Sequence, residues 1–110
     1  MRKIEMQMVD AIRNGENWSK DNTCVTFDTR ANESRKNYLV VLHGNPIATG
    51  CVGKTPEAIS FCGWVSKTTC SRLRALGVDV KVVNRIPVVE GVSKENSTRG
   101  WIHLNSIRNI

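Results

Sequence analysis

The hydrophobic residues at the start of the chain repeat with the period of an α-helix. Four of them follow the i, i+4, i+7, i+8 spacing that places side chains on one helix face: Ile4, Met8, Ala11 and Ile12. Gly15 comes next and can adopt the left-handed conformation that ends many helices. The pattern predicts a helix from Arg2 to Asn14. The following segment is polar apart from Trp18, which we expect to pack back onto this helix and the first strand.

Two short segments then show the features of a β-hairpin. Hydrophobic and polar residues alternate in Cys24–Asp28, and an apolar run occupies Tyr38–Leu42. A charged turn from Asp28 to Lys36 separates them. We therefore expect two antiparallel strands joined by this turn.

The next segments extend the hairpin into a meander. The turn at His43–Pro46 is favoured because Gly44 tolerates positive φ and proline keeps the residue before it extended. The segments Ile47–Val52 and Ala58–Trp64 are then two further strands, with a turn between them.

A second helix is predicted to end at Leu76. Its start is rich in hydroxyl side chains, since Ser66, Thr68 and Thr69 can each serve as an N-cap. Gly77 provides the stop. The inner face of this helix consists of Thr69, Leu73 and Leu76.

The last third of the chain reads as strands and one polar loop. Val78–Val82 alternates as a strand, and Arg85–Val92 adds an edge strand interrupted by Pro87. Ser93–Gly100 is a polar loop before a closing strand at Trp101–Leu104. The whole chain, residues 1–110, is expected to form one domain of α+β class. Two helices pack on an antiparallel sheet in the order α-β-β-β-β-α-β-β.

Positive charge is concentrated in the second half of the chain. The formal net charge is +6, and residues 61–110 contain eight Lys or Arg against three acidic residues. This imbalance indicates an anionic partner. We expect neither a membrane span nor export, because the sequence shows no apolar run of the length or kind that either requires. The four cysteines lack zinc-type spacing, so we expect free thiols that are mostly small core residues.

The start of the second helix is the leading candidate for binding phosphate. Free backbone N–H groups and Lys67 would complement an anion there, although a capped, solvated surface helix explains the same residues. A basic loop before Trp101 could follow a nucleic-acid backbone. The candidate nucleic-acid or anion-binding residues are Ser66, Lys67, Thr68, Ser71, Arg72, Arg74, Arg85, Lys94 and Arg99.

Nothing in the sequence favours an enzyme. Cys70 lies in the first turn of a helix near Lys67, which can activate a thiol. A base would have to come from His43 or His103, whose distance from Cys70 the sequence does not give. Neither histidine has metal-ligand spacing, and the glycines form no phosphate-binding loop. We expect no catalytic residues, no metal and no cofactor.

Several short motifs resemble those of a group of small tailed-bacteriophage proteins. The motifs are Trp18 with Asn22-Thr-Cys-Val25, Val41-Leu-His-Gly-Asn-Pro-Ile-Ala48, Gly63-Trp64 and Ser66-Lys-Thr-Thr-Cys-Ser-Arg-Leu-Arg-Ala-Leu76. Cys70 stands where that group usually has lysine, and Arg85–Arg99 looks like an insertion. The resemblance implies a phage accessory protein made in the cytoplasm of a host bacterium.

Together these observations predict a non-catalytic phage protein that binds nucleic acid through its basic C-terminal half. The alternative is an inhibitor or adaptor that docks on a bacterial host protein, as anti-defence and host-takeover factors do. Trp64 and Trp101 are the candidate anchors of such a protein interface. Edge strands of the expected sheet could also pair two copies into a homodimer.

Overall fold

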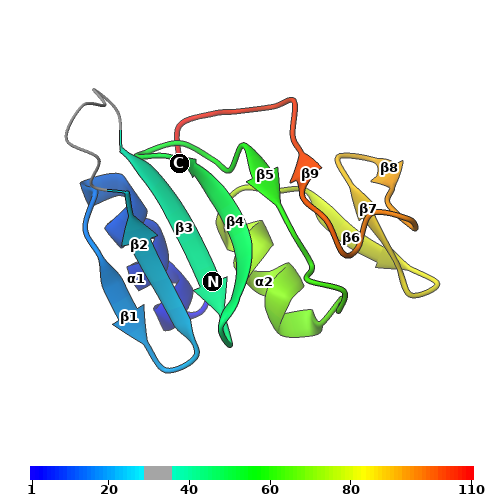
Figure 1. Ribbon diagram of the computed structural model, residues 1–110, viewed down its shortest axis with the longest axis horizontal. Helices are drawn as coiled ribbons and strands as arrows, with labels where there is room; N and C mark the ends of the chain where they lie inside the picture. Colours follow the sequence, from blue (N-terminus) through cyan, green and yellow to red (C-terminus); the bar gives the residue numbers. More distant parts are fainter. Residues whose placement is uncertain (29–35) are drawn as a thin grey trace.

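The computed structural model describes residues 1–28 and 36–110, which form two helices and two antiparallel sheets (Figure 1). The helices are α1 (Lys3–Asn14) and α2 (Lys67–Ala75). The strands of the larger sheet are β1 (Trp18–Lys20), β2 (Thr23–Phe27), β3 (Asn37–Leu42), β4 (Asn45–Cys51), β5 (Ala58–Ile59) and β9 (Ile102–His103). Those of the smaller sheet are β6 (Val80–Val83), β7 (Ile86–Val89) and β8 (Val92–Ser93).

The expected α+β class is confirmed, and so are both helices. The larger sheet has the order β1-β2-β3-β4-β5-β9, so β2 to β5 follow the chain as the predicted meander, although β5 covers only Ala58–Ile59 of the strand expected at Ala58–Trp64. The β3–β4 turn is the two-residue loop His43-Gly44, with φ of 51° and 78°. Positive φ at both loop residues is typical of the type I′ turn, whose backbone twist matches the right-handed twist of the two strands that it joins. The turn predicted from Asp28 to Lys36 lies mostly outside the described residues.

Both helices lie on the same face of the larger sheet. The strand residues that alternate toward this face are buried, including Val25, Tyr38 and Val40. They pack with the apolar stripe of α1 and the inner face of α2. From the helices, the core receives Met8, Val9, Ala11, Ile12, Cys70, Leu73 and Leu76. The predicted inner face of α2 is confirmed, because Thr69 is buried beside these residues.

Two strands were missed by the sequence pattern. The strand predicted at Arg85–Val92 is divided by a turn into β7 and β8, and the segment that forms β1 was not expected to be a strand. Trp18–Lys20 pairs antiparallel with β2 as an edge strand, although the segment is mostly polar. A solvated edge strand needs only one inward side chain, and Trp18 is that residue. It packs against the core, as expected for its role in packing.

The smaller sheet corrects the expected pairing of the C-terminal strands. The segment at Pro87 is not an edge, because β7 lies between β6 and β8. The Pro87 carbonyl accepts from the Lys94 N–H on the β8 side, at 2.9 Å. A residue in an antiparallel ladder directs its N and its C=O to the same neighbour. The missing proline N–H therefore faces the end of the short β8 and costs no bond to β6.

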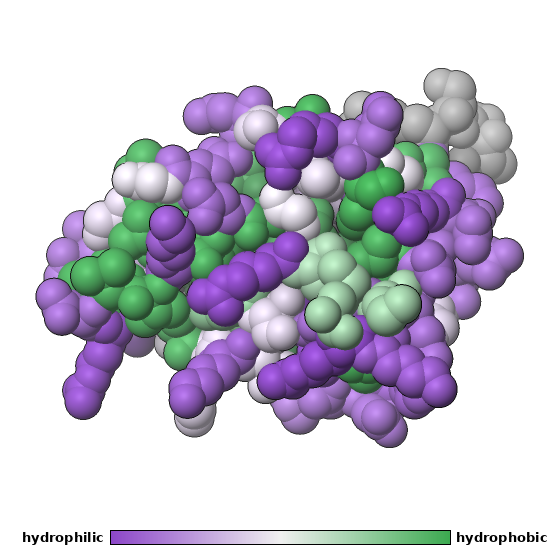
Figure 2. Space-filling model, turned by 180° about the vertical axis from the view of Figure 1, so that it is seen from behind, coloured by the Kyte–Doolittle hydropathy of each residue, from purple (hydrophilic) through white to green (hydrophobic). Residues whose placement is uncertain are grey.

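The smaller sheet lies at one end of the molecule, next to α2 and β9 (Figure 1). Val80 and Val89 are its two buried side chains in the hydrophobic core, whereas Val82, Val83 and Val92 are exposed. In the view from behind, hydrophobic residues gather toward this end of the molecule, with hydrophilic residues among them and around the rim (Figure 2). The closing strand β9 pairs with β5 and not with its neighbours in sequence.

Within residues 1–28 and 36–110 no helix is long and apolar enough to cross a membrane.

Candidate functional site

The predicted phosphate site at the start of α2 is partly occupied by the protein itself. Ser66 is the N-cap, and its Oγ accepts from the Thr69 N–H at 3.0 Å. The same Oγ lies 2.9 Å from the Thr69 hydroxyl. Lys67 is exposed and Thr68 is half-buried. Only these two residues of the first turn keep polar side chains that are not used in capping.

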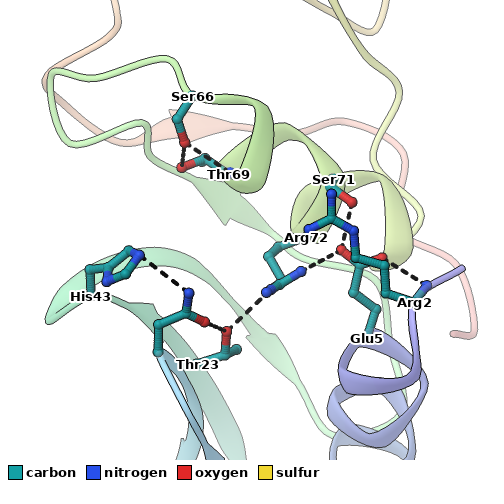
Figure 3. A network of polar contacts seen from close by, with 9 residues as sticks. Arg2, Glu5, Thr23, His43, Ser66, Thr69, Ser71 and Arg72 are labelled. Atoms are coloured by element: carbon teal, nitrogen blue, oxygen red, sulfur yellow. Dashed lines mark hydrogen bonds and ion pairs between the residues drawn. The ribbon is translucent and has the colours of Figure 1, made fainter.

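Arg72 is not available to a partner, which corrects the expectation that it contributes to a basic surface. Its side chain is 4% exposed, and its Nη1 lies 2.7 Å from Oε2 of Glu5 in α1. Arg72 Nε also donates to Thr23 Oγ1 at 3.1 Å. Ser71 donates to the same Glu5 oxygen at 2.6 Å. We call Glu5, Ser71, Arg72 and Thr23 the ion-pair cluster; it joins α1, α2 and β2 (Figure 3).

Hydrogen bonding keeps Glu5 charged inside the cluster. Burial raises the pKa of the Glu5 carboxyl, but hydrogen bonds from Ser71 and Arg72 outweigh this, so the pKa lies below its ordinary value. A buried ion pair with these additional hydrogen bonds fixes the geometry between elements. The role of Ser71 and Arg72 is therefore to hold α2 against α1.

The other cations predicted to bind a ligand differ in exposure and in the bonds that they make within the protein. Arg74 is exposed, but its Nε donates to the Val80 carbonyl at 2.8 Å and so ties α2 to β6. Lys94 is half-buried, and its backbone N–H is bonded within the smaller sheet. Arg85 and Arg99 are exposed.

An exposed tryptophan, Trp64, lies near Arg85 and Arg99. Trp64 is 75% exposed, and it lines one hollow together with Arg85 from the β6–β7 turn. The Gly63 N–H donates to the Thr98 carbonyl at 2.7 Å, which brings Arg99 alongside. The Arg99 Cγ would lie 3.6 Å from a Cβ at Gly63.

We call Trp64, Lys67, Arg85 and Arg99 the Trp64 surface. Lys67 adds its charge three residues after the tryptophan, in the first turn of α2. Glu95 is the acidic residue that lines the same hollow as Arg85. Trp101 is 42% exposed and lies apart from the lining of this hollow. Trp64 and Trp101, which we expected to serve together as anchors of a protein interface, thus differ in position: only Trp64 lines this hollow.

A pocket of about 350 Å³ opens on the other side of Trp64, between β3, β4 and the start of α2. We call it the β3–α2 pocket. Its apolar lining comes from Leu42, Ile47 and Phe61, all of which are buried. Polar groups from His43, Asn45 and Thr68 also line it, besides the capping hydroxyls.

A chain of hydrogen bonds leads from the ion-pair cluster to His43 on this pocket (Figure 3). The Thr23 hydroxyl accepts from Arg72 and must donate onward, and the atom that it reaches is Asn22 Oδ1 at 2.8 Å. The Asn22 amide nitrogen then lies 3.2 Å from His43 Nε2. An amide N–H donates, so Nε2 accepts and the proton of neutral His43 resides on Nδ1.

The cysteines give no support to thiol chemistry at Cys70. This residue is buried, and burial raises the pKa of its thiol. All four cysteines are free, but only Cys70 is a core residue, because the other three are half-buried. Among the described residues, no three His, Cys, Asp or Glu side chains are grouped to hold a metal.

Sequence reasoning missed the ion-pair cluster and the β3–α2 pocket. One signal for the cluster was present, because Glu5 precedes Met8, Val9 and Ile12 by three, four and seven residues. A carboxylate on the buried stripe needs a partner, so the sequence could have indicated that Glu5 pairs with a cation. The pocket had no such signal, since its lining comes from three separate elements.

Residues 1–96 match the family model described as Kyanoviridae Gp96 protein. The chain therefore belongs to this family of cyanophage proteins, and the resemblance to tailed-phage proteins is confirmed. The matched range includes most of the segment from Arg85 to Arg99 that looked like an insertion. Comparison with curated proteins and with solved structures found no match.

Proposed function

Starting from membership of a tailed-phage family, we propose that this Gp96-family protein binds single-stranded nucleic acid in the host bacterial cytoplasm. The nucleic acid lies on the Trp64 surface. The protein acts by binding and not by catalysis.

The observation that carries the proposal is the exposure of Trp64 among free cations. A tryptophan that is 75% exposed contributes little to the core and offers its ring to a ligand. Arg85 shares its hollow, Arg99 is held alongside Gly63, and Lys67 follows in α2. Bases stack on such a ring while cations contact phosphates, which is how proteins hold single strands without sequence preference.

The proposal sets the size of the effects to be measured. Stacking of one base on an aromatic side chain contributes about 1–3 kcal/mol, or roughly 5- to 150-fold in affinity. Three cations that each neutralise one phosphate of a single strand give a slope of about −2 in log K against log salt.

The test is the binding of a fluorescently labelled single-stranded oligonucleotide, followed by anisotropy at several salt concentrations. We expect Trp64→Ala to weaken binding within the range above and to leave the salt slope unchanged. Joint reversal of Lys67, Arg85 and Arg99 to glutamate should remove most of that slope. The matched control reverses three exposed lysines that lie outside the Trp64 surface, Lys3, Lys20 and Lys36, so that the change in net charge is the same. Equal losses in the two triple variants would contradict the proposed surface.

A second candidate function rests on the smaller sheet. Val83 is exposed on β6, and it shares one face of the smaller sheet with its half-buried partner Ile86 and with Val88, both on β7. An exposed apolar patch is typical of a surface that docks on another protein. This favours the alternative of an inhibitor or adaptor for a bacterial host protein, such as an anti-defence or host-takeover factor.

Affinity capture from host lysate separates the two candidates. A stoichiometric protein partner that survives nuclease treatment and is lost in Val83→Lys supports the second candidate. Recovery that depends on nucleic acid and on Trp64 supports the first.

A further inference from the structure

We infer that the β3–α2 pocket binds one unstacked nucleobase of the strand that lies on the Trp64 surface. The inference rests on the proposed function and names the part of the ligand that this pocket takes. Three features carry it: the pocket's size and apolar lining, the free polar groups beside that lining, and the position of Trp64.

The size and lining fit a small planar ring. The pocket volume of about 350 Å³ lies at the lower end of the range for small-molecule sites. Leu42, Ile47 and Phe61 are each held in the core, so this apolar lining is already formed without a ligand. A flat heterocycle can bury its faces against such groups, as unstacked bases do in nucleic-acid-binding proteins.

Free polar groups line the same pocket. No other described residue bonds the side chains of Asn45 and Thr68, and each of them can both donate and accept. His43 accepts from Asn22 through Nε2, which leaves Nδ1–H as a donor. A base carries donors and acceptors on its edge, and these three side chains offer both kinds. An aliphatic ligand would make none of these hydrogen bonds, so a base uses more of this lining.

Trp64 connects the pocket with the proposed binding surface. Its side chain lines the β3–α2 pocket and also the hollow that contains Arg85. A strand that stacks one base on Trp64 can therefore direct a neighbouring base into the pocket. Arg85 lines the second hollow at Trp64, where it can contact the phosphate backbone of the same strand.

The test uses free nucleosides, because they carry the base without a phosphate. Adenosine and uridine are titrated into the whole protein and followed by two-dimensional NMR of backbone and side-chain amides. We expect saturable shifts at Thr68 and at the Asn45 side-chain amide, with weak affinity. Ribose alone should cause none. Shifts that do not saturate, or that ribose reproduces, would overturn the inference.

A variant that fills the pocket provides the second measurement. Thr68→Phe places a ring in the pocket from a half-buried position, while Thr26→Phe adds the same ring to an exposed position of β2. Nucleoside shifts should disappear in the first variant and persist in the second. Persistence in Thr68→Phe would count against a base in this pocket.

The two proposals can fail separately. If the oligonucleotide binds with the expected dependence on Trp64 and salt but nucleosides cause no saturable shifts, the pocket inference is wrong and the proposed function stands. If neither binds, both are wrong.

Discussion

At the scale of single residues, the surface charge differs from the charge counted along the sequence. Arg72 belongs to the basic half of the chain, but its charge is paired inside the protein with Glu5 from the other half. By the 100° step of a helix, Arg72 points away from Arg74, and in the structure Arg72 is buried while Arg74 is exposed. The carboxylate that meets it could not be predicted, because the pair joins residues of two separate helices.

Replacing Glu5 by glutamine should remove a pH-dependent part of the stability. The carboxyl has a lowered pKa in the folded protein, so its contribution is present above its ordinary value of 4.5 and is lost as the pH falls through the folded pKa. The unfolding free energy of the unmodified protein should thus fall below about pH 4.5. Glu5→Gln should be less stable by about 3 kcal/mol at pH 7, because Arg72 keeps a buried charge without its partner. Urea denaturation between pH 7 and pH 3 measures both effects.

Asp10→Asn is the matched control for Glu5→Gln. Asp10 is another α1 carboxylate, but it is exposed and pairs with Arg13 on the surface at 3.6 Å. Exposed pairs contribute little, so this variant should change stability by less than about 1 kcal/mol. A Glu5→Gln variant with the same stability and pH profile as the Asp10 variant would refute the role of the ion-pair cluster.

At the scale of elements, most helices and strands could be predicted, but their pairing could not. Local sequence patterns located α1, α2 and the strands from β2 to β4. Each of these elements has one face on the core and one in solvent, which gives a helical or a two-residue period of hydrophobic residues. Pro87 misled the interpretation of β7, since the neighbour that its backbone faces depends on distant residues. The β3–α2 pocket escaped prediction for the same reason. The free cations of the Trp64 surface were foreseen individually, but the position of Arg99 beside Trp64 depends on the contact between Gly63 and Thr98, which are distant in sequence.

The packing of β3 against β4 makes Gly50 a position that does not tolerate a side chain. A Cβ there would lie 2.8 Å from Tyr38 Oη and 3.1 Å from the Thr55 carbonyl oxygen. The tyrosine is held in place because its hydroxyl donates to the Lys54 carbonyl at 2.9 Å. Gly50→Ala should therefore lower the unfolding free energy by about 1–3 kcal/mol. Thermal or chemical denaturation measures the loss.

Gly100→Ala serves as the control, because a Cβ at Gly100 would have no neighbour within 4 Å. This variant should match the unmodified protein closely. Tyr38→Phe in the Gly50→Ala background should recover part of the loss, since it removes the nearest atom. If the phenylalanine gives no recovery, the tyrosine hydroxyl is not the source of the strain.

At the scale of the whole molecule, the two sheets differ in how firmly they are anchored. The larger sheet is covered by both helices along β2 to β4. The smaller sheet contributes Val80 and Val89 to the hydrophobic core and is further tied by the bond from Arg74 to the Val80 carbonyl. Regions with few buried contacts open locally at lower free energy. The proposed apolar docking patch therefore lies on the part of the fold that opens most easily.

Amide hydrogen exchange should resolve this difference. We expect amides of β6 and β7 to exchange at least about tenfold faster than those of β3 at neutral pH, because local opening suffices to expose them. Peptide-level mass spectrometry after deuterium labelling measures both regions in one sample. Equal protection in the two sheets would show that they unfold together.

The pairing of β9 with β5 has a consequence for how the chain is made. On the ribosome, β5 is synthesised long before Ile102 and His103, and α2 with the entire smaller sheet lies between them in sequence. Until β9 is made, β5 presents an unpaired backbone edge, which is the kind of edge that recruits strands from other nascent chains. The pairing of Ile102 and His103 with β5 thus closes an edge that stays open while α2 and the smaller sheet are being synthesised.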